Sequence, residues 1–468
     1  MSPHVKSAIQ CIDRQISIVR AQIKSALDED FPPIGTKFQS LEETVSSLYQ
    51  ELGAYQMARK LQLAIIAEEN NDTLKAFLKS LDGKFRMVSW RPQTITFMGG
   101  VKIAILMPYY SRQCALTKGL TPHLALFGII QHLSPALSSL TAMLAAALSS
   151  YEETTAVLEK LTAKLNVKTV RCVAKAFAEN ARIGQETMNV HFKLPVEQGK
   201  DGIRRIVVST DGGRVRIRSK IRGNKNKGKG GRGRYKAEWK EPKLIIIIMV
   251  DENGRQSKLF SPIIDATMGG PSSAFALLKF YLSRTSLNKT TVSFISDGAK
   301  WIWNRTKKLF KDLNYPISKV IFILDYYHAV QHLNKMIAAK KGLKDSDRKA
   351  WVKKVKKWLL AGKVSRAIEA MEKICKGTRC KELKTELAYF KSHIDRCDYK
   401  TAREAGLPIG SGAVESAVRR VINLRLKGPG IIWNTDGADE MLLLRSFFKS
   451  GRWYQLEQWA FAHESFVI

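Results

Sequence analysis

Three acidic residues occupy positions suited to a metal-dependent phosphoryl-transfer site. Asp211 and Asp297 each end an apolar run typical of a strand, and glycine follows each of them. Glu415 lies in the first turn expected for a helix after Gly410, where the helix dipole favours an ionised carboxylate. Carboxylates repel one another, so a cluster of them needs a cation, and hard oxygen ligands suit Mg²⁺, with Mn²⁺ as a substitute. We expect the three to hold two such ions around a phosphate.

A histidine pattern adds to this candidate site. Asp325 ends the next apolar run, and His328 follows three residues later, so on a helix both side chains can face the same cleft. The plain alternative is a helix cap beside a packed imidazole. We expect Asp325 and His328 to support catalysis by proton transfer or by contact with the phosphate, and His332 could share their face one turn further on.

Strands and helices that would position these residues follow from periodicity. Strands are expected at 206–208, 214–218, 243–250, 258–267, 291–296 and 320–324, and helices at 272–283 and 301–310. Antiparallel strands followed by helix-separated strands describe a mixed sheet with helices on its faces, in the order of the ribonuclease H fold. A helix at 413–427, ended by Gly428 and Pro429, would carry Glu415.

The remaining segments are mostly helical. Residues 330–405 are expected to form an all-helical insertion, and helical periodicity recurs at 16–23 and 48–66. Strand-like runs at 93–97 and 101–107 form a small module to which we assign no chemistry. We expect six segments: 1–115, helical with the small module; 116–195, helical; 196–329, the first part of the catalytic core; 330–405, the insertion; 406–448, the second part of the core; and 449–468, a C-terminal tail.

The charge balance points to a polyanionic partner. The 468 residues include 77 Lys and Arg against 42 Asp and Glu, a net charge of +35. Nucleic acid fits because its counterions are released when many cations bind it. An anionic membrane is the rival, but we find no basic amphipathic anchor, lipidation signal or spanning segment, and expect no membrane partner.

Candidate DNA-binding residues lie in three basic regions, and two more, Lys300 and Arg419, lie close in sequence to Asp297 and Glu415. Two helices, one expected over 150–165 with Ser150 as its N-terminal cap and one from 168, could form a helix-turn-helix in the N-terminal region, or a plain helical hairpin. Residues 219–240 hold nine Lys or Arg and five Gly, and should order on DNA. Residues 335–363 hold eleven Lys or Arg and two Asp. The residues we expect to contact DNA are Lys168, Arg171, Lys175, Arg222, Lys225, Lys227, Lys229, Arg232, Arg234, Lys300, Lys353, Lys354, Lys357 and Arg419.

The chain begins without a signal-peptide pattern, and its six cysteines are scattered with no closely spaced pair. Free thiols in a reducing compartment are the simplest interpretation. We therefore expect a cytoplasmic, nucleoid-associated bacterial protein.

Several motifs resemble those of bacterial insertion-sequence transposases of the Kra type, related to Mutator-like transposases. They are found, in the same order as in that family, at 209–216, 238–243, 297–303, 324–329, 410–416 and 419–428. The resemblance implies a ribonuclease H-like core in which the Asp-Asp-Glu triad falls on Asp211, Asp297 and Glu415. It also implies that Asp325 and His328 match the Asp-x-x-His element of the Mutator-like group.

The expected function is therefore a DDE transposase. It would cut DNA at transposon ends, free a 3′ hydroxyl and transfer that strand into target DNA, acting on double-stranded DNA as a homodimer or larger assembly. One alternative is a ribonuclease H-fold nuclease without strand transfer, such as a junction resolvase. The other is a non-catalytic nucleic-acid-binding protein, which would use only the positive charge.

Overall fold

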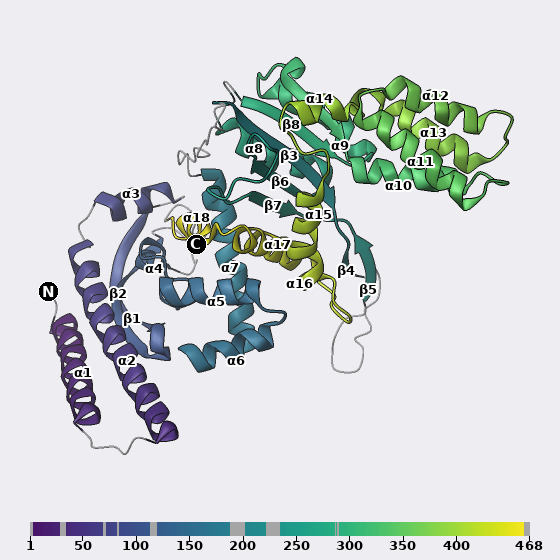
Figure 1. The fold of residues 1–468 in the computed structure, drawn as a ribbon. Helices are drawn as coiled ribbons and strands as arrows, with labels where there is room; N and C mark the ends of the chain where they lie inside the picture. The colour runs from purple at the N-terminus through teal and green to yellow at the C-terminus, as the bar shows by residue number, and fades with distance from the viewer. Residues whose placement is uncertain are drawn as a thin grey trace. The chain divides into compact units, whose positions relative to one another are not determined.

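The structure is a computed structural model that describes residues 3–28, 34–68, 72–81, 84–112, 119–187, 202–220, 235–285, 287 and 290–462. The chain divides into two compact units (Figure 1). Unit 1 comprises Met1–Asn189 and Trp453–Ile468, and unit 2 comprises Val190–Arg452. Within the described ranges, no helix has the length and apolar character needed to cross a bilayer.

Unit 1 is mostly helical and contains one β-hairpin. Its elements are α1 (Pro3–Leu27), α2 (Gly35–Glu68), α3 (Asp72–Ser80), β1 (Phe85–Thr96), β2 (Lys102–Arg112), α4 (Pro122–Leu126), α5 (Pro135–Ala147), α6 (Tyr151–Leu161), α7 (Val167–Thr187) and α18 (Trp453–Ala460). The expected helical stretches 16–23 and 48–66 lie inside α1 and α2, and the expected strands form the antiparallel β1–β2 hairpin.

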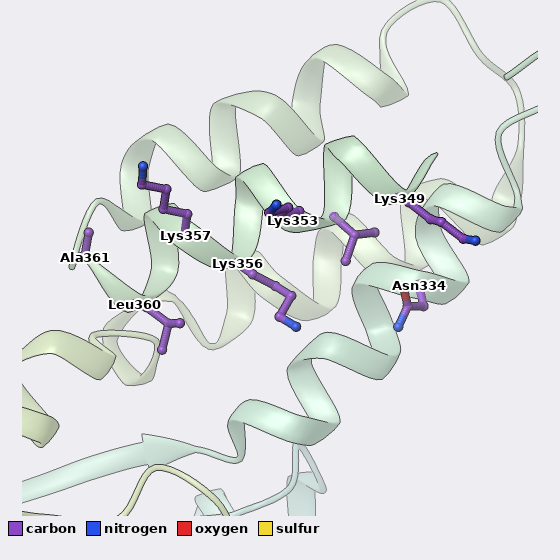
Figure 2. Close-up of a pocket in the computed structure, with 8 residues that line it drawn as sticks. Asn334, Lys349, Lys353, Lys356, Lys357, Leu360 and Ala361 are labelled. Carbon is purple, nitrogen blue, oxygen red and sulfur yellow. The ribbon is translucent and has the colours of Figure 1, made fainter. Parts of the chain in front are cut away.

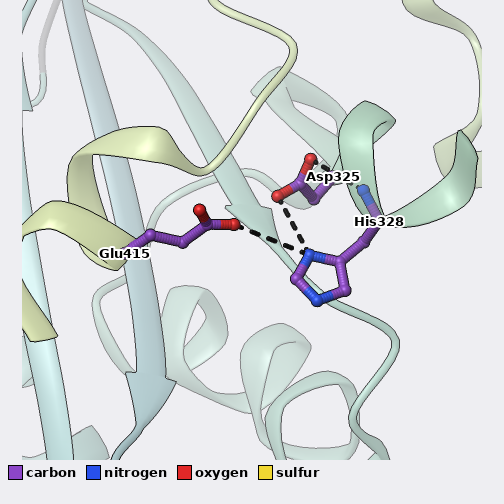
Figure 3. A group of neighbouring side chains, drawn as sticks. All are labelled: Asp325, His328 and Glu415. Carbon is purple, nitrogen blue, oxygen red and sulfur yellow. Dashed lines mark hydrogen bonds and ion pairs between the residues drawn. The ribbon is translucent and has the colours of Figure 1, made fainter. Parts of the chain in front are cut away.

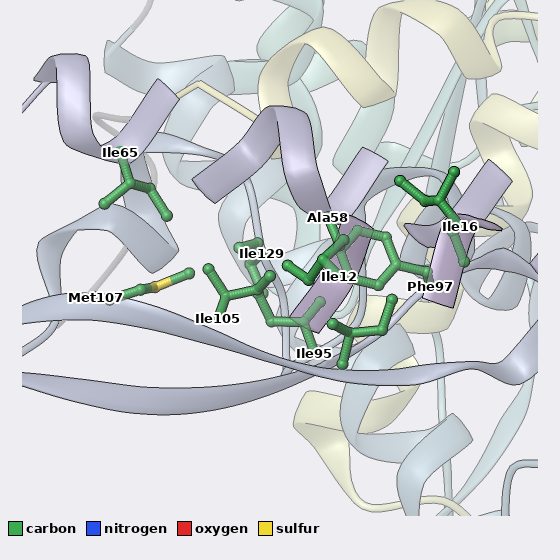
Figure 4. Close-up of a cluster of buried hydrophobic side chains, with 11 residues drawn as sticks. Ile12, Ile16, Ala58, Ile65, Ile95, Phe97, Ile105, Met107 and Ile129 are labelled. Atoms are coloured by element: carbon green, nitrogen blue, oxygen red, sulfur yellow. The ribbon is translucent and has the colours of Figure 1, made fainter. Parts of the chain in front are cut away.

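One core of unit 1 lies between the two long helices and the hairpin (Figure 4). Ile12 and Ile16 of α1 and Ile65 of α2 are buried with Ile95 and Ile105 of the hairpin. Burying one such side chain contributes roughly 1.5–3 kcal/mol, so this cluster gives the N-terminal segment its own stabilising core.

The C-terminal helix α18 packs against α7, so the segment expected as a tail contains a structured helix. The ring of Phe177 on α7 stacks on Trp453 at 5.6 Å between centroids and meets Phe461 edge-on. Elsewhere in unit 1, the hydroxyl of Ser150 accepts a hydrogen bond from the Glu153 backbone N–H at 2.9 Å. The expected cap of α6 is thereby confirmed.

Unit 2 is built on a five-stranded mixed sheet. Its strands are β3 (Arg204–Gly212), β6 (Lys243–Met249), β7 (Ile263–Thr267), β8 (Thr290–Ser296) and β9 (Val320–Leu324), in the spatial order β7-β6-β3-β8-β9. β3, β6 and β7 pair antiparallel, whereas β8 and β9 continue the sheet parallel to β3. The expected mixed sheet is confirmed, although the strand expected over 258–267 is confined to Ile263–Thr267 because the preceding residues form a loop.

A separate two-stranded ribbon emerges from the end of β3. β4 (Val215–Lys220) pairs antiparallel with β5 (Tyr235–Lys240) and belongs to a different sheet from β3. The strict alternation that predicted a half-buried strand at 214–218 is confirmed, since Val215 and Ile217 are buried and Arg218 is exposed.

Helices cover both faces of the central sheet. On one face, α8 (Gly270–Ser283) and α9 (Lys300–Asp312) pack aromatic rings on Phe294 of β8. On the other, α15 (Gly412–Val418) contacts β3 and β6, and α17 (Thr435–Lys449) contacts β7. The expected helix over 413–427 is present but interrupted, because Arg419–Asn423 form a π-helix before the short α16 (Leu424–Leu426).

The segment between β9 and α15 is helical, as expected for 330–405. It comprises α10 (Tyr326–Ala338), α11 (Asp345–Leu360), α12 (Val364–Cys375), α13 (Lys381–Ser392) and α14 (Tyr399–Glu404). The first helix begins directly after Asp325, so this helical segment is joined to the sheet at the candidate site itself.

Candidate active site

Three aspartates form one row across the parallel part of the sheet. Ser209 of β3 pairs with Ile295 of β8, and Ile295 pairs with Ile323 of β9. Two residues further along each strand stand Asp211, Asp297 and Asp325. Side chains two apart lie on the same side of a strand, so this register directs all three acids to one face. It is the face opposite Phe294, on which α15 packs and from which Glu415 approaches.

The Asp211 carboxylate is partly withdrawn from water and lies among other charges. One of its oxygens accepts the Gly212 backbone N–H at 2.6 Å. The pKa of Asp211 is raised to about 6, mainly by burial and also by the nearby Asp297 and Glu415 charges, while the Gly212 N–H and His328 act in the opposite direction. Like charges from three distant segments therefore meet at this carboxylate.

Asp297 is held by its own loop and by the helix that follows. Its side chain accepts the Ala299 backbone N–H at 3.0 Å, and its carbonyl accepts the Trp303 indole N–H at 2.6 Å. The next residue, Gly298, lies against the ring of Tyr389 from α13, and a Cβ at position 298 would overlap that ring. Glycine is thus required there for the insertion to pack beside Asp297.

Asp325 and His328 form a fixed pair (Figure 3). Asp325 is fully buried, caps α10, and accepts backbone N–H groups from Tyr327 at 2.7 Å and from Ser411 at 3.2 Å. The Ser411 hydroxyl donates to the same carboxylate. Burial alone would raise the pKa of Asp325, but the hydrogen bonds from His328, Ser411 and the backbone hold it below its ordinary value. This saturated carboxylate orients its neighbours and has little capacity left for a metal.

The imidazole of His328 links this pair to the glutamate. Its Nδ1 lies 3.4 Å from an Asp325 oxygen and 3.7 Å from a Glu415 oxygen. The hydrogen bond with Asp325 and the charges of Asp325, Asp297 and Glu415 raise the pKa of His328, against the effect of burial. Because Nδ1 faces the carboxylates, Nε2 is the nitrogen available to a substrate.

Glu415 approaches from the α15 side, in the first turn of that helix, with about half of its side chain exposed. The Ser411 hydroxyl lies 3.5 Å from one of its oxygens. Among the described residues, the one group of possible metal ligands whose atoms all lie within 4.8 Å is Asp325, His328 and Glu415. The expected set of Asp211, Asp297 and Glu415 is more open, although their charges act on one another.

The donor chemistry of this site fits a hard divalent cation. Asp211, Asp297 and Glu415 offer carboxylate oxygens, and burial together with the neighbouring Asp297 and Glu415 charges raises the pKa of Asp211. A cation here would lower that pKa again.

The described DNA-binding candidates are exposed and are found in both units. Lys168, Arg171 and Lys175 project from α7 in unit 1, and Lys175 pairs with Glu179 at 3.0 Å. In unit 2, Lys300 begins α9 and Arg419 follows α15 directly. Arg222, Lys225, Lys227, Lys229, Arg232 and Arg234 lie outside the described residues.

A basic groove runs along the insertion (Figure 2). Its volume is about 590 Å³, and it is lined by Lys349, Lys353, Lys356 and Lys357 of α11 with Asn334 of α10 and the apolar Val352, Leu360 and Ala361. The expected contacts Lys353 and Lys357 lie in this groove, whereas Lys354 lies over the ring of Trp358 at 5.1 Å. His332 faces a different environment, since its Nδ1 lies 2.5 Å from Glu386 and its ring stacks on Tyr389.

Two contributors to the site are absent from the sequence-based expectation. Ser411 donates to Asp325, and its Gly-Ser-Gly context before the Glu415 helix is a signal that could have identified it. Tyr389, whose buried hydroxyl has no hydrogen-bond partner among the described residues, lies within a helical insertion without any local motif.

Comparisons with protein-family models, with curated proteins and with solved structures give no match to this chain. The inference of function therefore depends on the chain's own geometry and motifs.

Proposed function

We propose that this chain is a metal-dependent DNA transposase of the DDE type. The observation that carries the proposal is the row of Asp211, Asp297 and Asp325 on one face of the sheet, with Glu415 approaching the same face from α15. Four acids on one surface oppose folding unless the site serves a cation or a proton.

The sheet supports this proposal. Three antiparallel strands followed by two parallel ones, in the order β7-β6-β3-β8-β9, is the arrangement we expect of a ribonuclease H-like core. In that core the first strand, the fourth strand and a later helix would supply the triad, which corresponds here to β3, β8 and α15. The helical segment between β9 and α15 would be the insertion typical of the Mutator-like group.

The residues have separate tasks in the proposed reaction. Asp211, Asp297 and Glu415 would hold Mg²⁺ or Mn²⁺, which when bound supplies electrostatic stabilisation to the phosphate under attack. Water adds to the phosphorus and releases a proton to solvent, the bond from phosphorus to the 3′ oxygen breaks, and the leaving oxygen takes up a proton. His328, whose pKa is raised by its hydrogen bond with Asp325, would donate that proton from Nε2.

Strand transfer would use the same groups in the opposite sense. The freed 3′ hydroxyl attacks a phosphate of the target strand, the bond from that phosphorus to the target strand's own 3′ oxygen breaks, and the imidazole of His328 now accepts the proton of the attacking hydroxyl. The leaving oxygen takes up a proton from solvent. Arg419, one turn beyond Glu415, and Lys300, three residues after Asp297, would hold the flanking phosphates. Two DNA ends must be joined in one event, so we propose that a dimer or larger assembly acts on double-stranded DNA.

A cleavage assay on DNA carrying the inverted repeats that flank the gene tests this proposal. Asp211→Asn, Asp297→Asn and Glu415→Gln should each abolish strand cutting in Mg²⁺ or Mn²⁺ while DNA binding stays within about twofold of wild type. The matched controls are Asp312→Asn and Glu404→Gln, exposed acids of unit 2 that pair only with surface lysines at 4.0 and 3.7 Å. Full cutting by all three site variants would remove the catalytic assignment.

The same preparation separates the rival functions. A nuclease without strand transfer would cut the ends but fail to join precut ends to a target plasmid. A non-catalytic nucleic-acid-binding protein would need no divalent ion, and none of the carboxylate changes would affect it.

A further inference from the structure

The β4–β5 ribbon presents an unusual surface on one side. Cross-strand register places Arg216 opposite Trp239 and Arg218 opposite Ala237. Side chains directly opposite each other lie on the same face of an antiparallel pair, and Tyr235 shares the face of Ala237 and Trp239. We call the set Arg216, Arg218, Tyr235 and Trp239 the arginine–aromatic face.

Cations and rings alternate on this face. The guanidinium of Arg218 lies 4.4 Å from the centre of the Tyr235 ring, and that of Arg216 lies 5.9 Å from the centre of the Trp239 ring. Despite these contacts, Trp239 is 55% exposed and Tyr235 is 43% exposed. Glu238, the acid within the ribbon, lies on the opposite face and pairs with Lys236 at 3.1 Å.

The ribbon is anchored well enough to hold this face in place. On its other side Val215 and Ile217 are fully buried. The edge of β4 that does not pair with β5 is hydrogen-bonded to Trp433. The Arg218 N–H donates to the Trp433 carbonyl at 2.7 Å, and the Trp433 N–H donates to the Arg216 carbonyl at 2.9 Å. The exposed rings therefore stand on a fixed backbone.

The chemistry of this face fits a nucleotide with an exposed base. Every base offers a flat surface for stacking on an aromatic ring, and guanidinium groups bind phosphate and stack as well. A surface that only had to be soluble would place Lys and Glu here rather than an exposed indole. A protein partner would need acidic groups to meet the two arginines, whereas DNA supplies negative charge and aromatic surface in one strand.

We propose that the arginine–aromatic face binds an unpaired nucleotide of a DNA strand, with Trp239 as the principal stacking surface. The ribbon continues from β3, and Arg216 is five residues beyond Asp211, so the two are at most roughly 17 Å apart along an extended strand. That span corresponds to about five nucleotides at the spacing of stacked bases. The proposed stacking depends only on the residues of the ribbon. Its distance from the cleaved bond depends on the proposed function.

Binding measurements on the full chain test the proposal without catalysis. We would compare a DNA duplex containing one unpaired nucleotide, the same duplex with an abasic residue at that position, the fully paired duplex, and an RNA duplex with the same unpaired base, all in Ca²⁺ or without a divalent ion. The wild-type chain should prefer the unpaired base in DNA. Trp239→Leu should reduce that affinity between about fivefold and a hundredfold and remove the preference over the abasic duplex. Trp239→Phe should keep most of it.

The controls separate stacking from charge and from misfolding. Tyr454→Leu removes a 72% exposed tyrosine from unit 1 and should leave the preference unchanged. Arg216→Gln keeps the Trp239 indole and should weaken binding to all of the DNA duplexes to a similar degree. The proposal is overturned if Trp239→Leu leaves the preference for the unpaired base intact, or if it weakens binding to the abasic duplex and to the duplex with the unpaired base equally. It is also overturned if the wild-type chain binds the RNA duplex more tightly than the DNA duplex with the same unpaired base.

Failure of this inference and failure of the proposed function give different results. A chain that cuts transposon ends but shows no Trp239-dependent preference contradicts only the stacking surface. A chain that keeps the preference but never cuts, with or without Asp211→Asn, contradicts only the transposase.

Discussion

At the scale of single residues, the candidate site places two carboxylates in different surroundings, and the proposed function gives them different tasks. Asp325 is buried and accepts several hydrogen bonds, whereas about half of the Glu415 side chain is exposed. His328 lies between them. Two carboxylates in such different surroundings perform different tasks, since the buried one fixes an orientation and the exposed one can reach an ion or a substrate.

His328→Gln should reduce strand cutting by about 10²- to 10⁴-fold, the usual contribution of a positioned acid or base. DNA binding should stay near wild type. A substrate with sulfur in place of the 3′ bridging oxygen should recover most of the activity, because a thiolate leaves without needing a proton. If the His328→Gln variant cuts the sulfur-containing substrate no faster than it cuts the ordinary oxygen substrate, His328 is not the proton donor.

His123 in unit 1 gives a separate prediction about stability. It is completely buried, neither ring nitrogen has a hydrogen-bond partner among the described residues, and burial lowers its pKa to about 4. The unfolded chain binds a proton near pH 6.5 and the folded chain only near pH 4, so stability must fall as the pH drops through that window. The decrease reaches about 3 kcal/mol at most.

Denaturant unfolding at pH 7.5 and pH 4.5 measures this effect. His123→Leu has no group to titrate and should lose less stability between the two pH values than the wild-type chain. Equal decreases in both chains would show that other groups cause the acid sensitivity.

At the scale of elements, the helix that carries Glu415 depends on a buried arginine. The π-helix Arg419–Asn423 leaves backbone carbonyls without their usual helical partners. Arg445 of α17 is 2% exposed and donates to the carbonyls of Val421, at 2.8 Å, and Arg420. Burial lowers the pKa of this guanidinium to about 10, which still leaves it charged at neutral pH. A buried cation thus fixes the segment that presents Arg419 beyond Glu415.

The insertion is expected to position Asp297 through Tyr389. In Gly298→Ala the new Cβ would overlap the Tyr389 ring, so the Asp297 loop must shift. A displacement near 1 Å can cost about 100-fold in rate, and strand cutting should fall by at least tenfold. Adding Tyr389→Ala should restore part of it by removing the obstructing ring.

The matched control for this pair is Gly53→Ala in α2, where a Cβ would meet nothing within 4 Å. It should leave cutting unchanged. If Gly298→Ala cuts normally, or if the double variant is no better than Gly298→Ala, the packing of α13 does not position Asp297.

The sequence predicts much of unit 2 because its signals are local. Apolar runs that end on Asp211, Asp297 and Asp325 predicted the strands. The acids were chosen as candidates because they stand at the ends of those runs. The Ser150 cap and the alternation in β4 were equally predictable. Tyr389 and Arg445 were not predictable, because each acts on residues far away in the chain and neither belongs to a local pattern. The π-helix was also hidden, since Ala413 to Leu426 has ordinary helical periodicity.

At the scale of the whole molecule, the charge of +35 predicts strongly salt-dependent DNA binding. Replacing Lys349, Lys353, Lys356 and Lys357 of the basic groove with Gln should make the plot of log affinity against log salt shallower. The slope should change by up to about 0.9 for each DNA phosphate that a lysine no longer neutralises. We expect cutting of bound DNA to persist at low salt.

A control with the same net charge isolates the groove. Lys6, Lys24, Lys37 and Lys60 are exposed on α1 and α2, and changing all four to Gln removes equal charge from unit 1. If the slope changes equally in both quadruple variants, DNA responds to the overall charge, and the groove on α11 has no special part.

The packing of α18 on α7 has a consequence for how the protein is made. Unit 1 starts at the N-terminus, yet Trp453 and Phe461, which cover Phe177, are translated only after the whole of unit 2. During translation, unit 2 can form its core first. Until α18 has been synthesised, Phe177 of α7 lacks the aromatic side chains that cover it. A gene copy interrupted anywhere before codon 453 would therefore leave unit 1 incomplete as well as truncating the C-terminus. The product would expose apolar surface and should be prone to aggregation and proteolysis.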